Sequence, residues 1–299
     1  MDMLTIENLK KRFADKEVLC GVNLSVPAHS VFGFVGRNGA GKTTTMKAVL
    51  GLLKPDSGEI FVSGERVVYG QTNTNQYIGY LPDVPEFYSY MTPLEYLHLC
   101  GEICGMNKPD IKERSCELLN LVGLEDENHR IKGFSRGMKQ RLGIAQALLN
   151  RPRLLICDEP TSALDPVGRK EILDILLAAR EQTTVLFSTH ILSDVERICT
   201  NVAFLDKGRI TIQGIVSEIR RIHFSEEFTV EITKDEDAKR LMQIFEDFRQ
   251  TGKNSFAFSG NGDRIFEILS YIVENKISVQ RIERLEPSLE SLFLEVAKQ

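Results

Sequence analysis

The sequence predicts an α/β protein with a mostly parallel, doubly wound sheet, a helical insert and a small α+β domain. Short apolar segments of strand length alternate with segments of helical periodicity along most of the chain. A glycine-rich segment directly follows one of the apolar strands, and the pattern changes after about Arg220. Alternating strands and helices favour a parallel sheet, because a crossover between parallel strands usually contains a helix.

The first part of the chain contains strands, one helix and a longer helical stretch. We expect strands at 3–9, 18–26, 30–36 and 59–64, and a helix at 43–50. Met46, Val49 and Leu50 have helical spacing in that helix, and a Pro-Asp-Ser-Gly turn follows it. From about residue 88 to residue 150 the pattern is helical, which predicts a helical subdomain.

The second part returns to alternation and then changes character. We expect strands at 153–158, 184–189 and 202–208, and helices at 168–180 and 191–199. Beyond a boundary near 215–227 we expect strands at 228–233, 255–260 and 277–284, helices at about 235–249 and 263–275, and an amphipathic helix at 288–298. The sequence thus predicts a first domain at 1–220 and an accessory α+β domain at 221–299.

Composition is that of an ordinary globular protein. Of 299 residues, 42% are hydrophobic and 26% are charged. The net charge of -5 argues against nucleic acid as the main partner. The six cysteines form no paired C-x-x-C sets, which favours reduced cytosolic thiols over a metal site. The N-terminus lacks the apolar core of a signal peptide, and no segment reaches the ~18 apolar residues of a membrane helix, so we expect no membrane span.

Residues 36–43 read GRNGAGKT and fit the phosphate-binding pattern G-x-x-x-x-G-K-[ST]. Glycines let backbone N–H groups approach phosphates, and the helix that begins near Thr43 directs its positive end at them. We expect Lys42 to reach the β- and γ-phosphates and the Thr43 hydroxyl to bind Mg²⁺. The preceding apolar strand and following helix argue against a chance match. The predicted ATP contacts are Gly36, Arg37, Asn38, Gly39, Ala40, Gly41, Lys42, Thr43 and Thr44.

Two carboxylates end the apolar strand at 154–158. Asp158 is suited to the Mg²⁺ site, and Glu159 to a general base that aligns the attacking water. Such a pair can simply face solvent, but the upstream phosphate loop and the following PTSALD favour function. His190 ends another apolar strand, at the sheet edge where ligands bind, and we expect it to contact the γ-phosphate.

The segment FSRGMKQR at 134–141 lies shortly before the carboxylate strand at 154–158. Here the chain resembles the ABC ATPase family, whose signature reads approximately L-S-G-G-Q. Over about residues 3–215 the order of motifs is similar: phosphate loop, helical insert, signature, carboxylate strand, SALD segment and histidine. The resemblance implies a RecA-like P-loop NTPase core with an antiparallel β part and a helical subdomain. It also implies hydrolysis of ATP, with Mg²⁺ as cofactor.

The resemblance implies roles for further residues. Ser135 would open a helix whose N-terminus can bind an anion, and in the family this terminus faces the γ-phosphate of a second subunit. A homodimer with ATP between the subunits is therefore expected. The implied signature residues are Ser135, Arg136, Gly137 and Met138, and the implied D-loop residues are Ser162 and Asp165. Phe13 matches an aromatic that stacks on adenine, although a ring beside a strand is as often core packing.

Three residues depart from the family pattern. Arg136 replaces the first signature glycine, and Met138 replaces the glutamine. Asp83 stands where the family usually has a glutamine that contacts Mg²⁺ and couples to the permease. Asp83 offers Mg²⁺ an oxygen ligand but is one methylene shorter, so its role as a ligand stays open. These departures, the segment 286–293 and the accessory domain resemble the subgroup that serves ABC-2-type exporters.

The expected function is an ATP-hydrolysing subunit that drives a separate membrane permease for export, at the cytoplasmic face of the cell membrane. The alternative is a soluble ABC ATPase that acts on ribosomes or nucleic acid. Such proteins usually carry two nucleotide domains or a long coiled-coil insert, whereas this chain has one phosphate loop and an acidic balance. A regulatory role of the accessory domain is compatible with the first interpretation.

Overall fold

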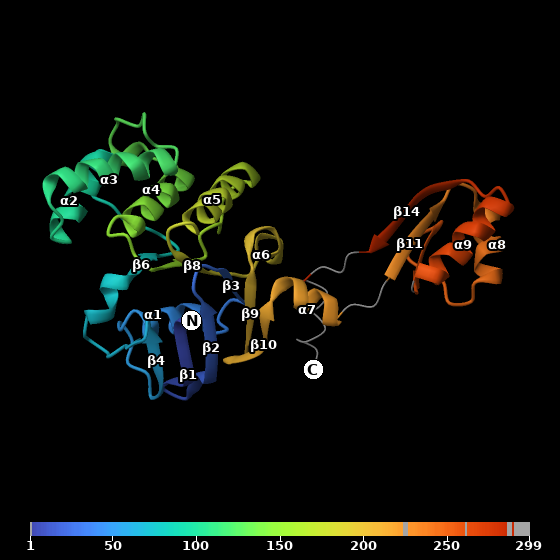
Figure 1. The fold of residues 1–299 in the computed structure, drawn as a ribbon, viewed down its shortest axis with the longest axis horizontal. Helices are drawn as coiled ribbons and strands as arrows, with labels where there is room; N and C mark the ends of the chain where they lie inside the picture. Colours follow the sequence, from blue (N-terminus) through green and yellow to red (C-terminus); the bar gives the residue numbers. More distant parts are fainter. Residues whose placement is uncertain (1, 224–226, 261, 286–288, 290–299) are drawn as a thin grey trace. The chain divides into compact units, whose positions relative to one another are not determined.

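The computed structural model describes residues 2–223, 227–260, 262–285 and 289. The chain forms two compact units, which divide after Val216 (Figure 1). Among the residues described, no helix is long and apolar enough to cross a membrane. The predicted α/β class of fold is confirmed. In the described residues the first unit has two sheets and the second has one, and each unit has its own core.

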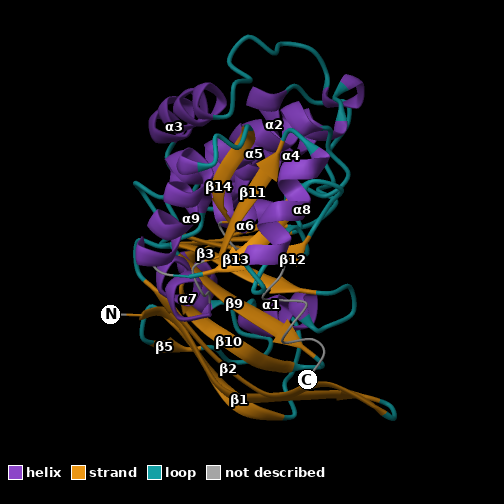
Figure 2. Cartoon of the chain, turned by 90° about the vertical axis from the view of Figure 1, so that its right-hand side faces the viewer, coloured by secondary structure: helices purple, strands orange, loops and turns teal. Residues whose placement is uncertain are grey.

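The first unit begins with an antiparallel sheet in the order β2-β1-β4-β5. Its strands are β1 (Asp2–Phe13), β2 (Lys16–Pro27), β4 (Ser57–Val62) and β5 (Glu65–Arg66). β1 and β2 form a long hairpin (Figure 2). Alternate residues of β1, among them Leu4 and Ile6, are buried, so one face of this sheet contributes to the core.

The second sheet of this unit has the order β10-β9-β3-β8-β7-β6. Its strands are β3 (Val31–Gly36), β6 (Ile78–Leu81), β7 (Leu154–Asp158), β8 (Thr184–Thr189), β9 (Asn201–Asp206) and β10 (Arg209–Ile215). In the described part of this sheet, neighbouring strands run parallel except at the edge, where β10 is antiparallel to β9. β3, β7 and β8 are buried along their whole length, as their continuous apolar runs require.

Helix α1 (Lys42–Val49) joins the two sheets. It contacts strands of both, and its Met46 and Val49 belong to one buried cluster with Leu4 and Phe34. Helices α5 (Pro166–Ala179) and α6 (Leu192–Ile198) follow β7 and β8. The packing of α1 against these strands places its start beside the carboxyl end of β3, where the glycine-rich loop lies.

The helical subdomain consists of α2 (Pro93–Ile103), α3 (Lys108–Leu121) and α4 (Arg136–Leu148), and Figure 1 shows it at the opposite end of the first unit from the antiparallel sheet. Short 3₁₀ turns lie at Asn73–Tyr77 and Ile131–Gly133. Each of the three helices has a side-chain N-cap, from Thr92, Asn107 and Ser135. Ser135 therefore opens α4, as predicted.

The second unit begins within α7 (Val216–His223) and has an antiparallel sheet in the order β12-β13-β11-β14. The strands are β11 (Glu227–Ile232), β12 (Arg249–Gln250), β13 (Ser255–Ser259) and β14 (Val279–Leu285), and the helices are α8 (Asp235–Ile244) and α9 (Gly262–Glu274). Phenylalanine rings fill its core. Phe248 stacks on Phe258 with ring centroids 5.0 Å apart.

Two helices predicted for the second unit either end earlier in the structure or lie outside its described residues. The helix predicted to continue to residue 249 ends at Ile244, because Phe245 and Phe248 turn into the core and Arg249 and Gln250 pair with β13. The helix predicted at 288–298 lies outside the described residues, except for Leu289.

Candidate nucleotide-binding site

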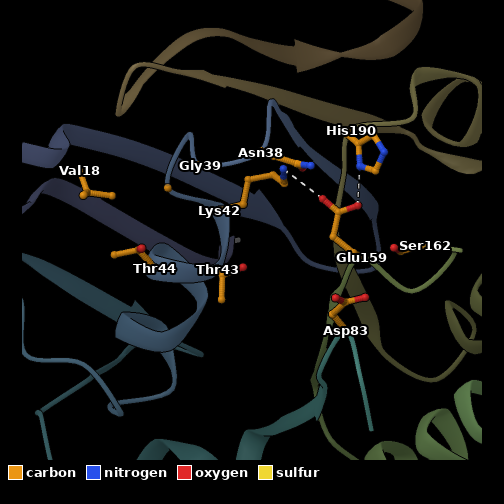
Figure 3. Close-up of a pocket in the computed structure, with 11 residues that line it drawn as sticks. Val18, Asn38, Gly39, Lys42, Thr43, Thr44, Asp83, Glu159, Ser162 and His190 are labelled. Carbon is orange, nitrogen blue, oxygen red and sulfur yellow. Dashed lines mark hydrogen bonds and ion pairs between the residues drawn. The ribbon is translucent and has the colours of Figure 1, made fainter.

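The glycine-rich loop between β3 and α1 has backbone angles that favour glycine. Gly39 has φ 80° and Gly41, the N-cap of α1, has φ 114°. A Cβ at Gly41 would lie 2.7 Å from Leu19 Cδ2, so even a methyl group would clash. This loop forms one wall of a pocket of about 360 Å³ (Figure 3). The pocket is lined by Val18, Asn38, Gly39, Gly41, Lys42, Thr43, Thr44, Asp83, Glu159, Ser162 and His190.

Lys42 is buried at the base of this pocket, with a side chain only 6% exposed. Its Nζ donates to the carbonyl oxygens of Gly36 at 2.6 Å and Arg37 at 3.3 Å. It also forms an ion pair with Glu159 Oε1 at 3.1 Å. These oxygen atoms offset the charge of the buried ammonium group. The same group could bind an anionic ligand in the pocket.

Asp158 is held by two hydroxyl groups at the carboxyl end of β7. Thr43 Oγ1 donates to Oδ2 at 2.7 Å, and Ser188 Oγ donates to Oδ1 at 2.6 Å. Ser188 Oγ also accepts from the backbone N–H of Glu159 at 3.0 Å. The sequence does not identify this serine, which pairs with Asp158 across the β7–β8 ladder. In the sequence, a serine in a buried strand cannot be distinguished from other small residues. Only the register of the strands shows that it lies beside Asp158.

Glu159 has an unusual backbone and two partners. Its φ is 49°, a left-handed conformation that residues with side chains seldom adopt and that is frequent at functional sites. Oε1 pairs with Lys42, and Oε2 lies 2.8 Å from His190 Nδ1 (Figure 3). The carboxylate therefore connects the phosphate loop to the end of β8.

Asp83 is the second carboxylate that lines the pocket, on the same side as Glu159 (Figure 3). Its Oδ1 lies 3.4 Å from Arg136 Nη2 of α4. Burial raises the pKa of Asp83, Arg136 opposes this rise, and the charges of Asp158 and Glu159 add to it. Asp83 thus lies close to other negative charges, although its side chain is half-exposed.

Some predicted site residues lie outside this pocket. Ser135 accepts from Met138 N at 3.2 Å as the N-cap of α4, and Gly137 follows it in the first turn. Asp165 caps α5 by accepting from Gly168 N at 3.0 Å. The remaining ones are Gly36, Arg37, Ala40, Arg136, Asp158 and Phe13.

Phe13 is 46% exposed, with Lys11 Nζ 5.4 Å from the ring centroid. Core packing, one of its two possible roles, is therefore ruled out. Stacking on adenine stays a prediction.

A second group that the sequence does not identify lies behind the pocket. Asp194 of α6 is 2% exposed and accepts from Thr161 Oγ1 at 2.7 Å and from Arg169 Nε at 2.6 Å. Thr161 follows Glu159 by two residues, and Asp194 follows His190 by four. The group therefore connects the segments that carry these two side chains.

Comparison with known proteins identifies the family. A profile described as "ABC transporter" matches residues 19–162. The chain is 37% identical to the uncharacterized ABC transporter ATP-binding protein YxlF of Bacillus subtilis (strain 168), over 98% of this chain and 99% of the relative. It is 34% identical to the bacitracin transport ATP-binding protein BcrA of Bacillus licheniformis, over 97% and 95%.

The chain belongs to the ABC transporter ATP-binding proteins. A solved ATP-binding subunit of an ABC transporter is also similar, with a TM-score of 0.66 and 32% identity over 73% of this chain and 92% of that one. The predicted P-loop NTPase fold is confirmed by this likeness. The chain is an ATP-binding subunit and an ATPase that powers transport. These relatives give no support to an ATPase that acts on ribosomes or nucleic acid.

Proposed function

We propose that this ABC ATP-binding subunit energises a separate ABC-2-type permease for export, working as a homodimer at the cytoplasmic face of the membrane. The observation that carries the proposal is the similarity to the bacitracin transport ATP-binding protein, which covers 97% of this chain. That coverage extends through the second unit as well as the ATPase unit. The resemblance of the departures at Asp83 and Arg136 to the exporter subgroup supports the same assignment.

The proposed chemistry is hydrolysis of ATP with Glu159 as the general base. A triphosphate in the glycine-rich loop competes with Glu159 for Lys42, since both are anionic ligands of the same ammonium group. The carboxylate is then free to align and deprotonate the attacking water. His190, 2.8 Å from Oε2, holds the carboxylate on the pocket side.

The oxygen atoms near the carboxyl end of β7 fit a magnesium ion. Thr43 Oγ1 and Asp158 Oδ2 are 2.7 Å apart, and both belong to the hard oxygen donors that Mg²⁺ prefers. When bound with ATP, Mg²⁺ would neutralise charge on the β- and γ-phosphates. Thr43 and Asp158 are the residues that would hold it. Asp83 lines the pocket with Thr43, and its role as a metal ligand stays a prediction.

The homodimer is supported by the exposure of the signature. Ser135 and Arg136 are exposed at the start of α4 and do not line the pocket of their own chain. The first turn of a helix presents free N–H groups and a partial positive charge, so it can receive phosphate oxygens from another subunit. Two copies would then each complete the other's site.

The permease can be identified by affinity purification from detergent-solubilised membranes of the host. The tagged Glu159→Gln chain is loaded with Mg-ATP, which should hold the dimer closed, and the co-purifying proteins are identified by mass spectrometry. The matched control is Glu181→Gln, which makes the same change at an exposed position in the same unit.

We expect a polytopic membrane protein to be recovered with Glu159→Gln more strongly than with the control. Recovery of ribosomal or nucleic-acid-associated proteins alone would contradict the proposal.

A further inference from the structure

Two residues that depart from the family pattern contact each other. Asp83 follows β6, and Arg136 is the first residue of α4. They are 53 residues apart in the sequence, yet Arg136 Nη2 lies 3.4 Å from Asp83 Oδ1. The negative charge of Asp83 is thus matched by the positive charge of Arg136.

Asp83 occupies a place where an unmatched negative charge would hinder nucleotide binding. It follows β6, whose last residue, Leu81, pairs with Cys157 just before the two carboxylates of β7. Figure 3 shows it on the side of the pocket that holds Glu159 and faces the phosphate loop. ATP carries several negative charges, and a carboxylate that faces them repels them unless a cation lies beside it.

The other two carboxylates near Asp83 have their own partners. Glu159 pairs with Lys42, and Asp158 accepts from the hydroxyl groups of Thr43 and Ser188. Lys42 would be drawn to the phosphates once ATP binds, so it cannot also offset Asp83. Arg136 reaches Asp83 from the helical subdomain and provides this compensation.

Helix α4 holds the backbone of Asp83 as well as its side chain. Gln140 is fully buried, and its Nε2 donates to the carbonyl oxygen of Asp83 at 2.6 Å. Arg136 and Gln140 are one turn apart, so both project from the same face of α4. The loop with Asp83 is therefore fixed to the start of the signature helix at two points.

We propose that Arg136 is a positioning residue for Asp83. Arg136 neutralises the carboxylate and holds it at the pocket rim, so that the pocket accepts MgATP. The inference rests on the ATPase role of the pocket and is independent of which permease the chain serves.

The test is a double-mutant cycle on the purified full chain. The four proteins are the wild type, Asp83→Asn, Arg136→Gln and the double variant, and KM for MgATP and kcat are measured for each at low ionic strength. For this half-exposed pair we expect Arg136→Gln to raise KM roughly threefold to fivefold in the wild-type background. In the Asp83→Asn background the same change should raise KM by less than about 1.5-fold, because no charge is left to compensate.

Two further variants separate charge from shape. Arg136→Lys keeps the cation and should restore KM to within about twofold of the wild-type value. Lys139→Gln removes a second cation of α4, which lines a groove together with Asp83 and Arg136. Its effect on KM should differ less between the wild-type and the Asp83→Asn backgrounds than that of Arg136→Gln, because the ion pair described for Asp83 is with Arg136.

An equal rise in KM in both backgrounds on removal of Arg136 would overturn the proposal, since Arg136 would then act on nucleotide directly. An unchanged KM in the Arg136→Gln chain would overturn it as well. Equilibrium binding of a fluorescent ATP analogue gives the same cycle without turnover. A chain that binds the analogue but does not hydrolyse ATP would refute the catalytic assignment, while the cycle would still decide the pairing.

Discussion

At the scale of single residues, the site depends on hydroxyl groups that hold carboxylates in place. Ser188 donates to Asp158 and accepts from the backbone of Glu159, so one hydroxyl fixes both acids at the carboxyl end of β7. It is fully buried, so these hydrogen bonds are made away from bulk solvent. The geometry of the metal-binding and catalytic carboxylates should accordingly depend on this serine.

We predict that Ser188→Ala lowers kcat for ATP at least tenfold, since small displacements of catalytic groups have effects of roughly this size. The free energy of unfolding should fall by about 1–3 kcal/mol, because a buried carboxylate oxygen loses its donor. Ser30→Ala is the control, since Ser30 is also buried and donates to Pro27 O at 2.6 Å, near the opposite end of β3. It should lose stability without losing turnover, and an equal loss of turnover would contradict the prediction.

The residues of the site are predictable to different degrees. The phosphate loop, Asp158, Glu159 and His190 can be identified because sequence spacing and flanking strands define them. Ser188 and Asp194 cannot, because their roles arise from strand register and from helix packing between distant segments. The contact between Asp83 and Arg136 is equally hidden, although both residues stand out as departures.

At the scale of elements, α5 and α6 are joined by one partly buried and one exposed ion pair. In the partly buried pair, the buried Asp194 of α6 accepts from Arg169 of α5 at 2.6 Å and also from Thr161. In the exposed pair, Arg197 of α6 donates to Asp174 of α5 at 2.9 Å. Buried, hydrogen-bonded charges are costly to disrupt, whereas exposed pairs contribute little.

We predict that Asp194→Asn lowers the free energy of unfolding by about 1–3 kcal/mol, since the amide weakens the hydrogen bonds that the buried carboxylate accepts from Thr161 and Arg169. It should also lower kcat, because Thr161 and Asp194 anchor the segments of Glu159 and His190. Asp174→Asn should change stability by less than about 1 kcal/mol and leave kcat unchanged. Thermal unfolding and steady-state ATPase assays check both, and equal effects of the two substitutions would contradict the expectation.

Most strands and helices are predictable, and the exceptions have physical causes. β3, β7 and β8 are evident because they are apolar throughout and buried on both faces. β6 and β10 are missing from the prediction. Both are edge strands of the larger sheet, and neither has the continuous buried run of the central strands. The predicted end of α8 is wrong because Phe245 and Phe248 have helical spacing in the sequence. In the structure both rings are buried in the core but lie beyond the end of the helix.

At the scale of the whole molecule, the two units have separate cores. The first is built from the two sheets and α1, and the second from a phenylalanine-rich cluster between its sheet and helices. All predicted site residues lie in the first unit. The sequence indicates this division through the change of pattern near residues 215–227, and the structure divides after Val216.

We predict that a chain that ends at residue 223 folds and hydrolyses ATP with kcat and KM within about twofold of the full chain, because it keeps the first core and the site. Calorimetry should show that the full chain has an additional unfolding transition that the shortened chain lacks. An inactive but folded shortened chain would indicate that the second unit regulates the ATPase.

The central claim is that Glu159 drives ATP hydrolysis in the pocket between the phosphate loop and β7. Its most direct test is parallel measurement of ATP turnover and ATP binding in the full-length Glu159→Gln chain. We predict that turnover falls by about 10²-fold or more, because the amide cannot accept the proton of water, while ATP binding is retained. Turnover at the wild-type rate would contradict the assignment of Glu159 as the base.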